Sequence, residues 1–191
     1  MQRSFILLCG LLLALPLRAA DPDGKFAVDG VGARSCAEFT SVLDKPEGRT
    51  AFANWSQGFL TAYNVFTDDT FDITPWQPQE LVLAKMAVFC RANPDVVYIN
   101  GLSALIRSLI PDRVIRDSPL IAVRHSGKSV FLYRSMLARL RGDLNAAGYD
   151  AGAPDAPFAD GLIRALRAYQ EDQGLVVSGL PDGQTLNALY P

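Results

Sequence analysis

Residues that carry out chemistry are scarce in this chain of 191 residues. It has one histidine, His125, and three cysteines. His125 lies beside Arg124 in a basic stretch, where we expect a solvated side chain. A catalytic zinc ion is held largely by histidine or cysteine ligands, which the composition does not supply. The chain also contains no nucleophile elbow and no phosphate-binding glycine loop. We therefore expect no enzymatic activity, no bound metal and no cofactor.

Long apolar runs are absent beyond the first twenty residues. There, Arg3 precedes an almost unbroken apolar run at 5–17, and Ala19 and Ala20 follow it. This pattern is typical of a cleaved secretory signal peptide. The run is too short for a bilayer, which takes about 20 apolar residues. We predict a signal peptide at 1–20, a periplasmic protein, and no membrane span in the mature form.

Basic charge is also in short supply. The chain has 18 basic and 20 acidic residues, and cleavage after residue 20 removes Arg3 and Arg18. The mature form then carries 16 basic and 20 acidic side chains, for a net charge of −4. This balance argues against a nucleic-acid partner.

Two cysteines remain once Cys9 is removed with the signal peptide. In an exported chain, Cys36 and Cys90 most simply pair with each other. The pairing would close a long loop and stabilise the fold by about 4 kcal/mol. It would also remove both thiols from catalysis and from metal binding.

Apolar residues at three- and four-residue steps predict helices in the N-terminal half. The third helix, for example, places Leu83, Met86 and Cys90 on one face. Asn93 is the expected N-cap of the fourth, with Pro94 at its first position. We predict a flexible arm at 21–32 and a disulfide-stapled four-helix domain at 33–111. The expected helices cover residues 35–43, 49–66, 79–92 and 93–110.

The next stretch, 112–130, has no sustained periodicity; it follows Pro111 and contains Pro119. We predict a connector there, in which "LIAV" (120–123) is either linker or a short strand. A second helical set follows at 131–191, with helices at 133–147, at 160–172 and after Asp182 as an N-cap. The predicted fold class is all-α, with two small helical domains.

An ordered set of short motifs fills residues 131–191. A leucine-rich helix leads to a Gly-Tyr turn, a loop, a helix that ends in Tyr-Gln, a Gly-Leu loop and an Asp-capped helix with Thr-Leu. In this order the segment resembles the peptidoglycan-binding-like domain found at one end of many bacterial cell-wall hydrolases. The residues that carry the resemblance are Gly148, Tyr149, Asp155, Phe158, Tyr169, Gln170, Gly174, Leu175, Ser178, Gly179, Asp182, Thr185 and Leu186.

The resemblance implies a three-helix domain that binds peptidoglycan in a groove around Tyr149, Phe158 and the 174–182 loop. Two glycines of the family's loop are replaced here, by Ala156 and Ala159, and a usual threonine is Leu162. Glycine permits positive φ or a close approach of a ligand, so these departures bear more on binding than on the fold. The candidate contact residues are Tyr149, Asp155, Phe158, Tyr169, Gln170, Ser178 and Asp182.

The N-terminal half resembles the HdeA-type periplasmic acid-stress chaperones, which are helical and have a single disulfide. This resemblance implies a domain that binds other proteins as partners or clients. Similar domains in periplasmic immunity proteins leave an alternative open, an inhibitor of an enzyme or toxin that attacks the envelope. The residues that carry the resemblance are Cys36, Phe39, Trp55, Gly58, Cys90, Asn93 and Pro94.

Two acidic clusters bear on a second alternative, an accessory cell-wall hydrolase, because muramidases work with two carboxylates. One cluster contains Asp68, Asp69 and Asp72, and the other contains Glu171 and Asp172. They lie in a predicted loop and at a predicted helix end, where we expect solvated acids. The sequence therefore favours a binding protein over an enzyme.

Overall fold

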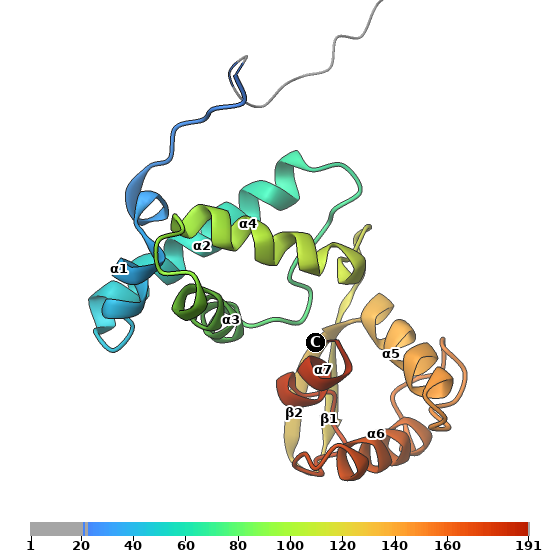
Figure 1. Cartoon of the computed structure of the whole chain (residues 1–191). Helices are drawn as coiled ribbons and strands as arrows, with labels where there is room; N and C mark the ends of the chain where they lie inside the picture. Colours follow the sequence, from blue (N-terminus) through green and yellow to red (C-terminus); the bar gives the residue numbers. More distant parts are fainter. Residues whose placement is uncertain (1–20, 22, 191) are drawn as a thin grey trace, which may run out of the picture.

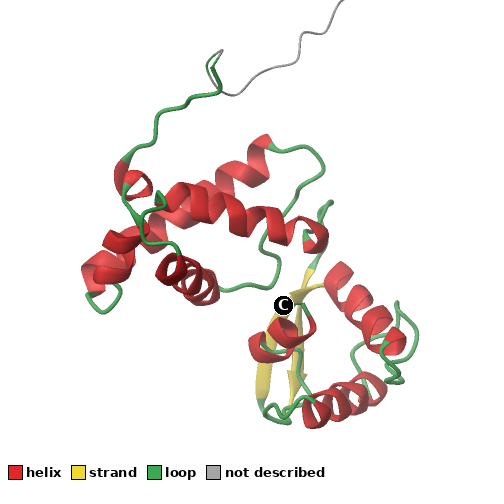
Figure 2. Cartoon of the chain, in the orientation of Figure 1, coloured by secondary structure: helices red, strands yellow, loops and turns green. Residues whose placement is uncertain are grey.

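A computed structural model describes residue 21 and residues 23–190 of the chain. Two helical lobes follow each other along the sequence (Figure 1). Helices dominate both lobes, and the sheet of the described part has two strands (Figure 2). The predicted all-α class with two small helical domains is confirmed. The predicted signal peptide lies outside the described residues.

Four α-helices build the N-terminal domain. Their bounds are α1 (Cys36–Ser41), α2 (Pro46–Phe66), α3 (Gln79–Ala92) and α4 (Tyr98–Leu109), with 3-10 turns η1 (Gly30–Ala33) before them and η2 (Ile110–Asp112) after them. No helix of the described residues is long and apolar enough to cross a membrane.

An aromatic cluster lies at the centre of this domain. The ring of Tyr98 packs against those of Phe39 and Phe52, with centroids 4.8 and 4.7 Å apart. The Tyr98 hydroxyl shares a hydrogen bond of 2.8 Å with the hydroxyl of Ser56, which is also buried. Three helices, α1, α2 and α4, are therefore held by side chains that meet at one point.

The predicted disulfide between Cys36 and Cys90 is confirmed. It joins the first turn of α1 to the last turn of α3, and neither residue has any exposed surface. Ser35 and Glu38 form a capping box at the start of α1, so this short helix is fixed at its N-terminus twice.

The predicted start of the fourth helix is wrong: α4 begins at Tyr98, four residues after Pro94. Asn93 does not cap it, and its side-chain amide instead donates to the carbonyl of Phe89 (2.9 Å). The carbonyls of Pro94 and Val96 accept from two first-turn N–H groups of α1, at 2.9 and 2.8 Å. Such N–H groups have no partner within their own helix. With a turn at this place, the two carbonyls are free to accept from the N–H groups of α1. In a helix, they would accept from N–H groups of that helix instead.

The end of the arm predicted at 21–32 packs on the N-terminal domain. The indole N–H of Trp55 donates a hydrogen bond to the carbonyl of Asp29 (2.8 Å). The backbone of Gly32 lies against the same indole, so closely that a Cβ at this position would be 1.9 Å from its ring. Trp55 therefore anchors the arm at its C-terminal end.

A β-hairpin occupies much of the connector predicted at 112–130. Strands β1 (Leu120–His125) and β2 (Lys128–Tyr133) pair antiparallel. The two residues between them, Ser126 and Gly127, both have positive φ (49° and 74°), as type I′ hairpin turns require. Of the two alternatives that the sequence leaves open for 120–123, the structure adopts the strand.

The hairpin belongs to the C-terminal domain, because Val123 and Leu132 are buried in its core. Three helices complete the domain: α5 (Arg134–Ala146), α6 (Asp160–Asp172) and α7 (Gly183–Leu189). Gly148 and Gly174 end α5 and α6 with φ values of 94° and 64°, which side chains disfavour. Asp182 caps α7 as predicted and accepts from the N–H of Thr185 (3.0 Å).

The two domains are joined by a loop as well as by the chain. Trp76, from the loop between α2 and α3, is part of the C-terminal core and packs on Tyr190. In the same loop, Asp72 forms a β-bridge with Val114 and accepts a hydrogen bond from the Tyr133 hydroxyl (3.0 Å). These contacts place the start of α3 beside the C-terminal domain.

Candidate functional site

A buried polar network holds the loop between α6 and α7. Gln170 has no exposed surface, and its amide NH₂ donates to the Leu180 carbonyl (2.9 Å) and to the Thr185 hydroxyl (2.8 Å). Its amide oxygen accepts from the N–H of Gly179 (2.8 Å). The Ser178 hydroxyl lies 3.0 Å from the same NH₂. Gln170 is thus fully used inside the domain and presents nothing to a ligand.

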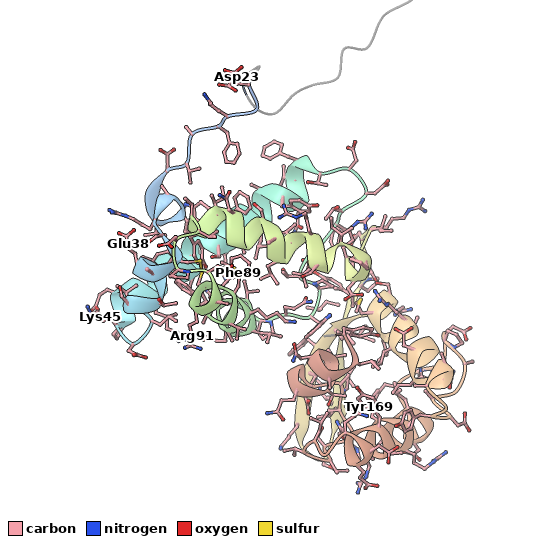
Figure 3. The ribbon with its side chains drawn as sticks, in the orientation of Figure 1. Asp23, Glu38, Lys45, Phe89, Arg91 and Tyr169 are labelled. Carbon is pink, nitrogen blue, oxygen red and sulfur yellow. A yellow bond between two sulfur atoms is a disulfide. The ribbon has the colours of Figure 1, made fainter. Side chains whose placement is uncertain are left out.

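The two candidate tyrosines lie together at the C-terminal end of α6. Tyr169 is buried, and Tyr149 packs edge-on against it with ring centroids 5.6 Å apart. The Tyr149 hydroxyl donates to a carboxylate oxygen of Asp172 (2.8 Å), and this hydrogen bond raises the pKa of Tyr149. Figure 3 shows Tyr169 within the C-terminal lobe. Of the pair, only Tyr149 is half-exposed.

A buried arginine organises the loop between α5 and α6. Arg141 is 2% exposed, and its guanidinium donates to the carbonyls of Ala151 and Pro157. Burial lowers the pKa of Arg141. Along this loop Asp155 is exposed, and Phe158 is half-buried against the core. These two candidates line a groove of about 720 Å³ beside the hairpin.

The departures from the family pattern fit this loop without strain. Ala159 is the N-cap residue of α6 with an extended backbone (φ −152°), and Ala156 does not have a positive φ either. Leu162 has no exposed surface and is a core residue. The fold therefore tolerates these three replacements, as the sequence predicts.

The structure does not gather all seven candidates around one groove. Phe158 precedes the first turn of α6, whereas Tyr149 contacts Asp172 in the last one. A helix of 13 residues is roughly 20 Å long. Tyr149 and Phe158 thus lie at opposite ends of α6, and Ser178 and Asp182 border a different groove.

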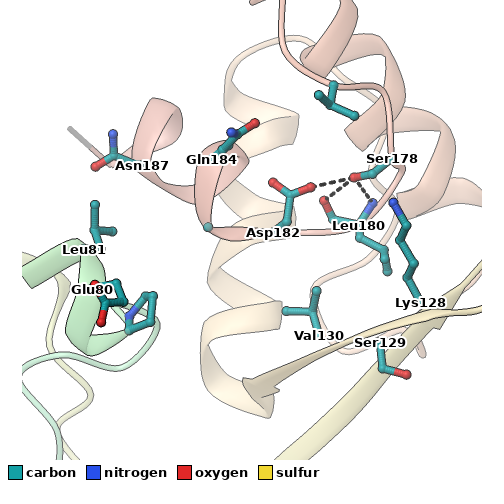
Figure 4. A pocket seen from close by; sticks show the side chains of 13 residues that line it. Glu80, Leu81, Lys128, Ser129, Val130, Ser178, Leu180, Asp182, Gln184 and Asn187 are labelled. Atoms are coloured by element: carbon teal, nitrogen blue, oxygen red, sulfur yellow. Dashed lines mark hydrogen bonds between the residues drawn. The ribbon is translucent and has the colours of Figure 1, made fainter. Parts of the chain in front are cut away.

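That groove lies between the two domains and has a volume of about 660 Å³ (Figure 4). One side is the start of α3, with Glu80 and Leu81. The others are β2, with Lys128 and Val130, and the segment from Val176 to α7. The cavity is within the usual size range of small-ligand sites.

Ser178 and Asp182 shape the rim of the interdomain groove. The Ser178 hydroxyl donates to Asp182 (2.7 Å), and the other carboxylate oxygen accepts from Thr185. Asp182 is therefore occupied by its capping role. The groove's other residues, such as Lys128 and Asn187, are not among the predicted candidates, because nothing in a local motif indicates that β2 and α7 meet α3.

The two acidic clusters are partly engaged in structural contacts. Asp72 accepts from Tyr133 and from the N–H of Thr74, and Asp172 accepts from Tyr149. The Asp72 carboxylate adds to burial in raising the pKa of Tyr133 to about 12. Among the residues described, no group of three or more histidine, cysteine, aspartate or glutamate side chains could hold a metal ion.

The C-terminal helices match a known family. Residues 134–189, from α5 to α7, match the model of the family described as "Putative peptidoglycan binding domain". No curated protein and no solved structure matches the chain. The C-terminal domain is a peptidoglycan-binding-like domain, which confirms the resemblance seen in this part of the sequence. The HdeA-type resemblance of the N-terminal half stays a prediction.

Proposed function

We propose that this protein is a non-catalytic periplasmic protein that associates with peptidoglycan through its C-terminal domain. The family match over 134–189 carries this proposal. The two grooves that border the domain, each large enough for a small ligand, support it. The oxidation of both described cysteines supports a role without a catalytic thiol.

Co-sedimentation with purified peptidoglycan sacculi tests the proposal. We expect the mature chain to pellet with sacculi, to pellet several-fold less with cellulose, and to be displaced by soluble muropeptides. The Leu166→Asp variant is expected to lose this retention, because an unpaired charge in the C-terminal core unfolds the domain. Val88→Asp adds the same charge at an exposed position of α3 and should bind like the parent chain.

Equal pelleting with sacculi and cellulose would contradict wall association. The same incubation also tests the alternative of an accessory cell-wall hydrolase. We expect no muropeptides to be released from the sacculi, and their release by the purified chain would establish an enzyme instead.

We also propose that the N-terminal domain binds other proteins in a chaperone-like way. Val65 and Phe66, at the end of α2, are 67% and 85% exposed. Two adjacent apolar side chains with so much exposed surface offer a contact for apolar segments of another protein. The alternative is an immunity or inhibitor protein that binds one envelope-directed enzyme or toxin.

Acid would act on this domain through its carboxylates. Residues 21–112 carry twelve acidic and seven basic side chains. The N–H of Ser35 donates to the Glu38 carboxylate, and this hydrogen bond lowers the pKa of Glu38. A lowered folded-state pKa means that the stabilisation is present above the ordinary value and is lost as the pH falls through the folded-state value. Acid therefore loosens the start of α1.

Aggregation of unrelated proteins near pH 3, followed by light scattering, tests the chaperone-like role. We expect the parent chain to suppress aggregation, and we expect a Val65→Ser, Phe66→Ser variant to suppress it less. A matched Val88→Ser variant, with its exposed side chain on α3, should behave like the parent. A chain that keeps its near-UV circular dichroism at pH 3 and protects no client would favour the inhibitor alternative.

A further inference from the structure

Both domains build the interdomain groove. A wall-binding module alone would not need a contribution from the N-terminal domain. Leu81, from α3, packs against the core of the C-terminal domain and lines the groove together with Val130 and Leu180. Figure 4 shows Leu81 opposite Asn187 of α7. The N-terminal domain therefore completes a site whose other sides belong to the C-terminal domain.

One polar atom at this groove lacks the partner that its burial requires. The side-chain oxygen of Asn187 is buried and accepts no hydrogen bond from any described residue. Buried polar atoms are nearly always hydrogen-bonded. The Asn187 residue lines the groove, and a rotation of its side chain would turn this oxygen toward an N–H donor of a ligand there.

Lys128 supplies the positive charge at this groove. Glu80 is paired with Arg49, and the Asp182 carboxylate accepts hydrogen bonds from the neutral Ser178 and Thr185. Lys128 is exposed at the start of β2 and forms no ion pair with a described residue. In Figure 4 its side chain extends along the groove toward the 178–180 segment. The groove thus offers one ammonium group to an anionic ligand.

The apolar part of the lining is aliphatic, and Ser129 and Gln184 add two more polar side chains. Leu81, Val130 and Leu180 supply apolar surface, and none of the described residues that line the groove is aromatic. Sugar rings are commonly bound by stacking on flat aromatic side chains, which this groove does not offer. A peptide with small apolar side chains, amide N–H groups and a carboxylate fits the aliphatic walls, the Asn187 oxygen and the Lys128 ammonium.

We infer that the interdomain groove binds the peptide stems of peptidoglycan and not its glycan strands, and that both domains contribute to the site. The inference rests on the proposed association with peptidoglycan. Peptide stems carry methyl groups, amides and free carboxylates, which are the three features that the groove can recognise. The N-terminal domain then acts in wall binding through Leu81.

Competition for sacculi distinguishes the two parts of the polymer. We expect free stem tetrapeptide to displace the bound full-length chain, and peptide-free glycan strands not to displace it. Lys128→Gln should weaken sacculus binding roughly tenfold, since a hydrogen bond to a charged group is lost. Asn187→Leu should weaken it to a similar extent. Lys45→Gln, which changes an exposed lysine of the N-terminal domain that does not line the groove, is the matched control.

Each outcome decides the inference. Displacement by glycan alone would overturn it and leave wall association standing, whereas no binding to sacculi at all would overturn both. Displacement by the peptide with unchanged affinity of both groove variants would place the peptide elsewhere. Lys128→Gln changes an exposed strand residue, so its near-UV circular dichroism should match the parent chain even if that of Asn187→Leu does not.

Discussion

Replacement of both Cys36 and Cys90 by alanine is expected to lower the free energy of unfolding of the N-terminal domain by about 4 kcal/mol. The disulfide spans a sequence separation of 54 residues and joins the first helix of the domain to its third. In the chain-entropy model, this crosslink stabilises the fold by restricting the unfolded chain. A loss of this size is a large part of the stability of a small domain.

Urea unfolding of the parent chain and of the double variant measures the loss. The two tryptophans separate the domains, because Trp55 packs on Phe59 in the N-terminal domain and Trp76 lies in the C-terminal core. A Trp76→Phe background leaves Trp55 to report on the domain that the disulfide braces. Reductant should destabilise the parent and leave the alanine variant unchanged. A loss below about 1 kcal/mol would contradict the expected bracing role.

Replacement of Gln170 by leucine is expected to lower the stability of the C-terminal domain by about 2–5 kcal/mol. Leucine cannot accept from the N–H of Gly179 or donate to the Leu180 carbonyl. Both of these residues are buried. A buried group without its partner costs about 1–3 kcal/mol, and the variant removes the acceptor of the Gly179 N–H and the shorter of two hydrogen bonds to the Leu180 carbonyl. The 174–182 loop should lose its fixed conformation first.

Urea unfolding followed by Trp76 fluorescence, in a Trp55→Phe background, checks this prediction. Gln173→Leu, three residues further along at an exposed position, is the matched control and should stay within about 0.5 kcal/mol of the parent. Sacculus binding by the same variants separates two roles of Gln170. Unchanged stability with lost binding would make Gln170 a ligand contact, as the motif resemblance implies, and not the structural residue that its burial indicates.

Helix positions were the most predictable part of the fold. The predicted bounds of α3 and α6 agree with the structure, because each helix has a regular apolar face and a clear stop after it. The predicted start of α4 was wrong because the carbonyls of Pro94 and Val96 accept hydrogen bonds from α1, which lies far earlier in the sequence. No local pattern contains that information.

The candidate contact residues stay a prediction, and the structure shows only where each of them lies. Gln170 and Tyr169 belong to the family pattern, and the structure places both in the interior. Motif matching selects residues that hold a fold as readily as residues that touch a ligand. Lys128 and Asn187, which we propose as ligand contacts, fall outside the motif-based candidates, because their common groove exists only where β2, α7 and α3 come together.

The sequence by itself determined the helical class, the pairing of two cysteines and the type of the C-terminal domain. These depend on composition, on which cysteines are present and on the order of short motifs, all of which can be read without knowing how distant segments pack. Only the tertiary structure decided that the hairpin joins the C-terminal core, that Trp76 docks there, and that a groove opens between the domains. Those features arise from contacts between segments far apart in sequence, which pack together because burial removes their apolar surface from water.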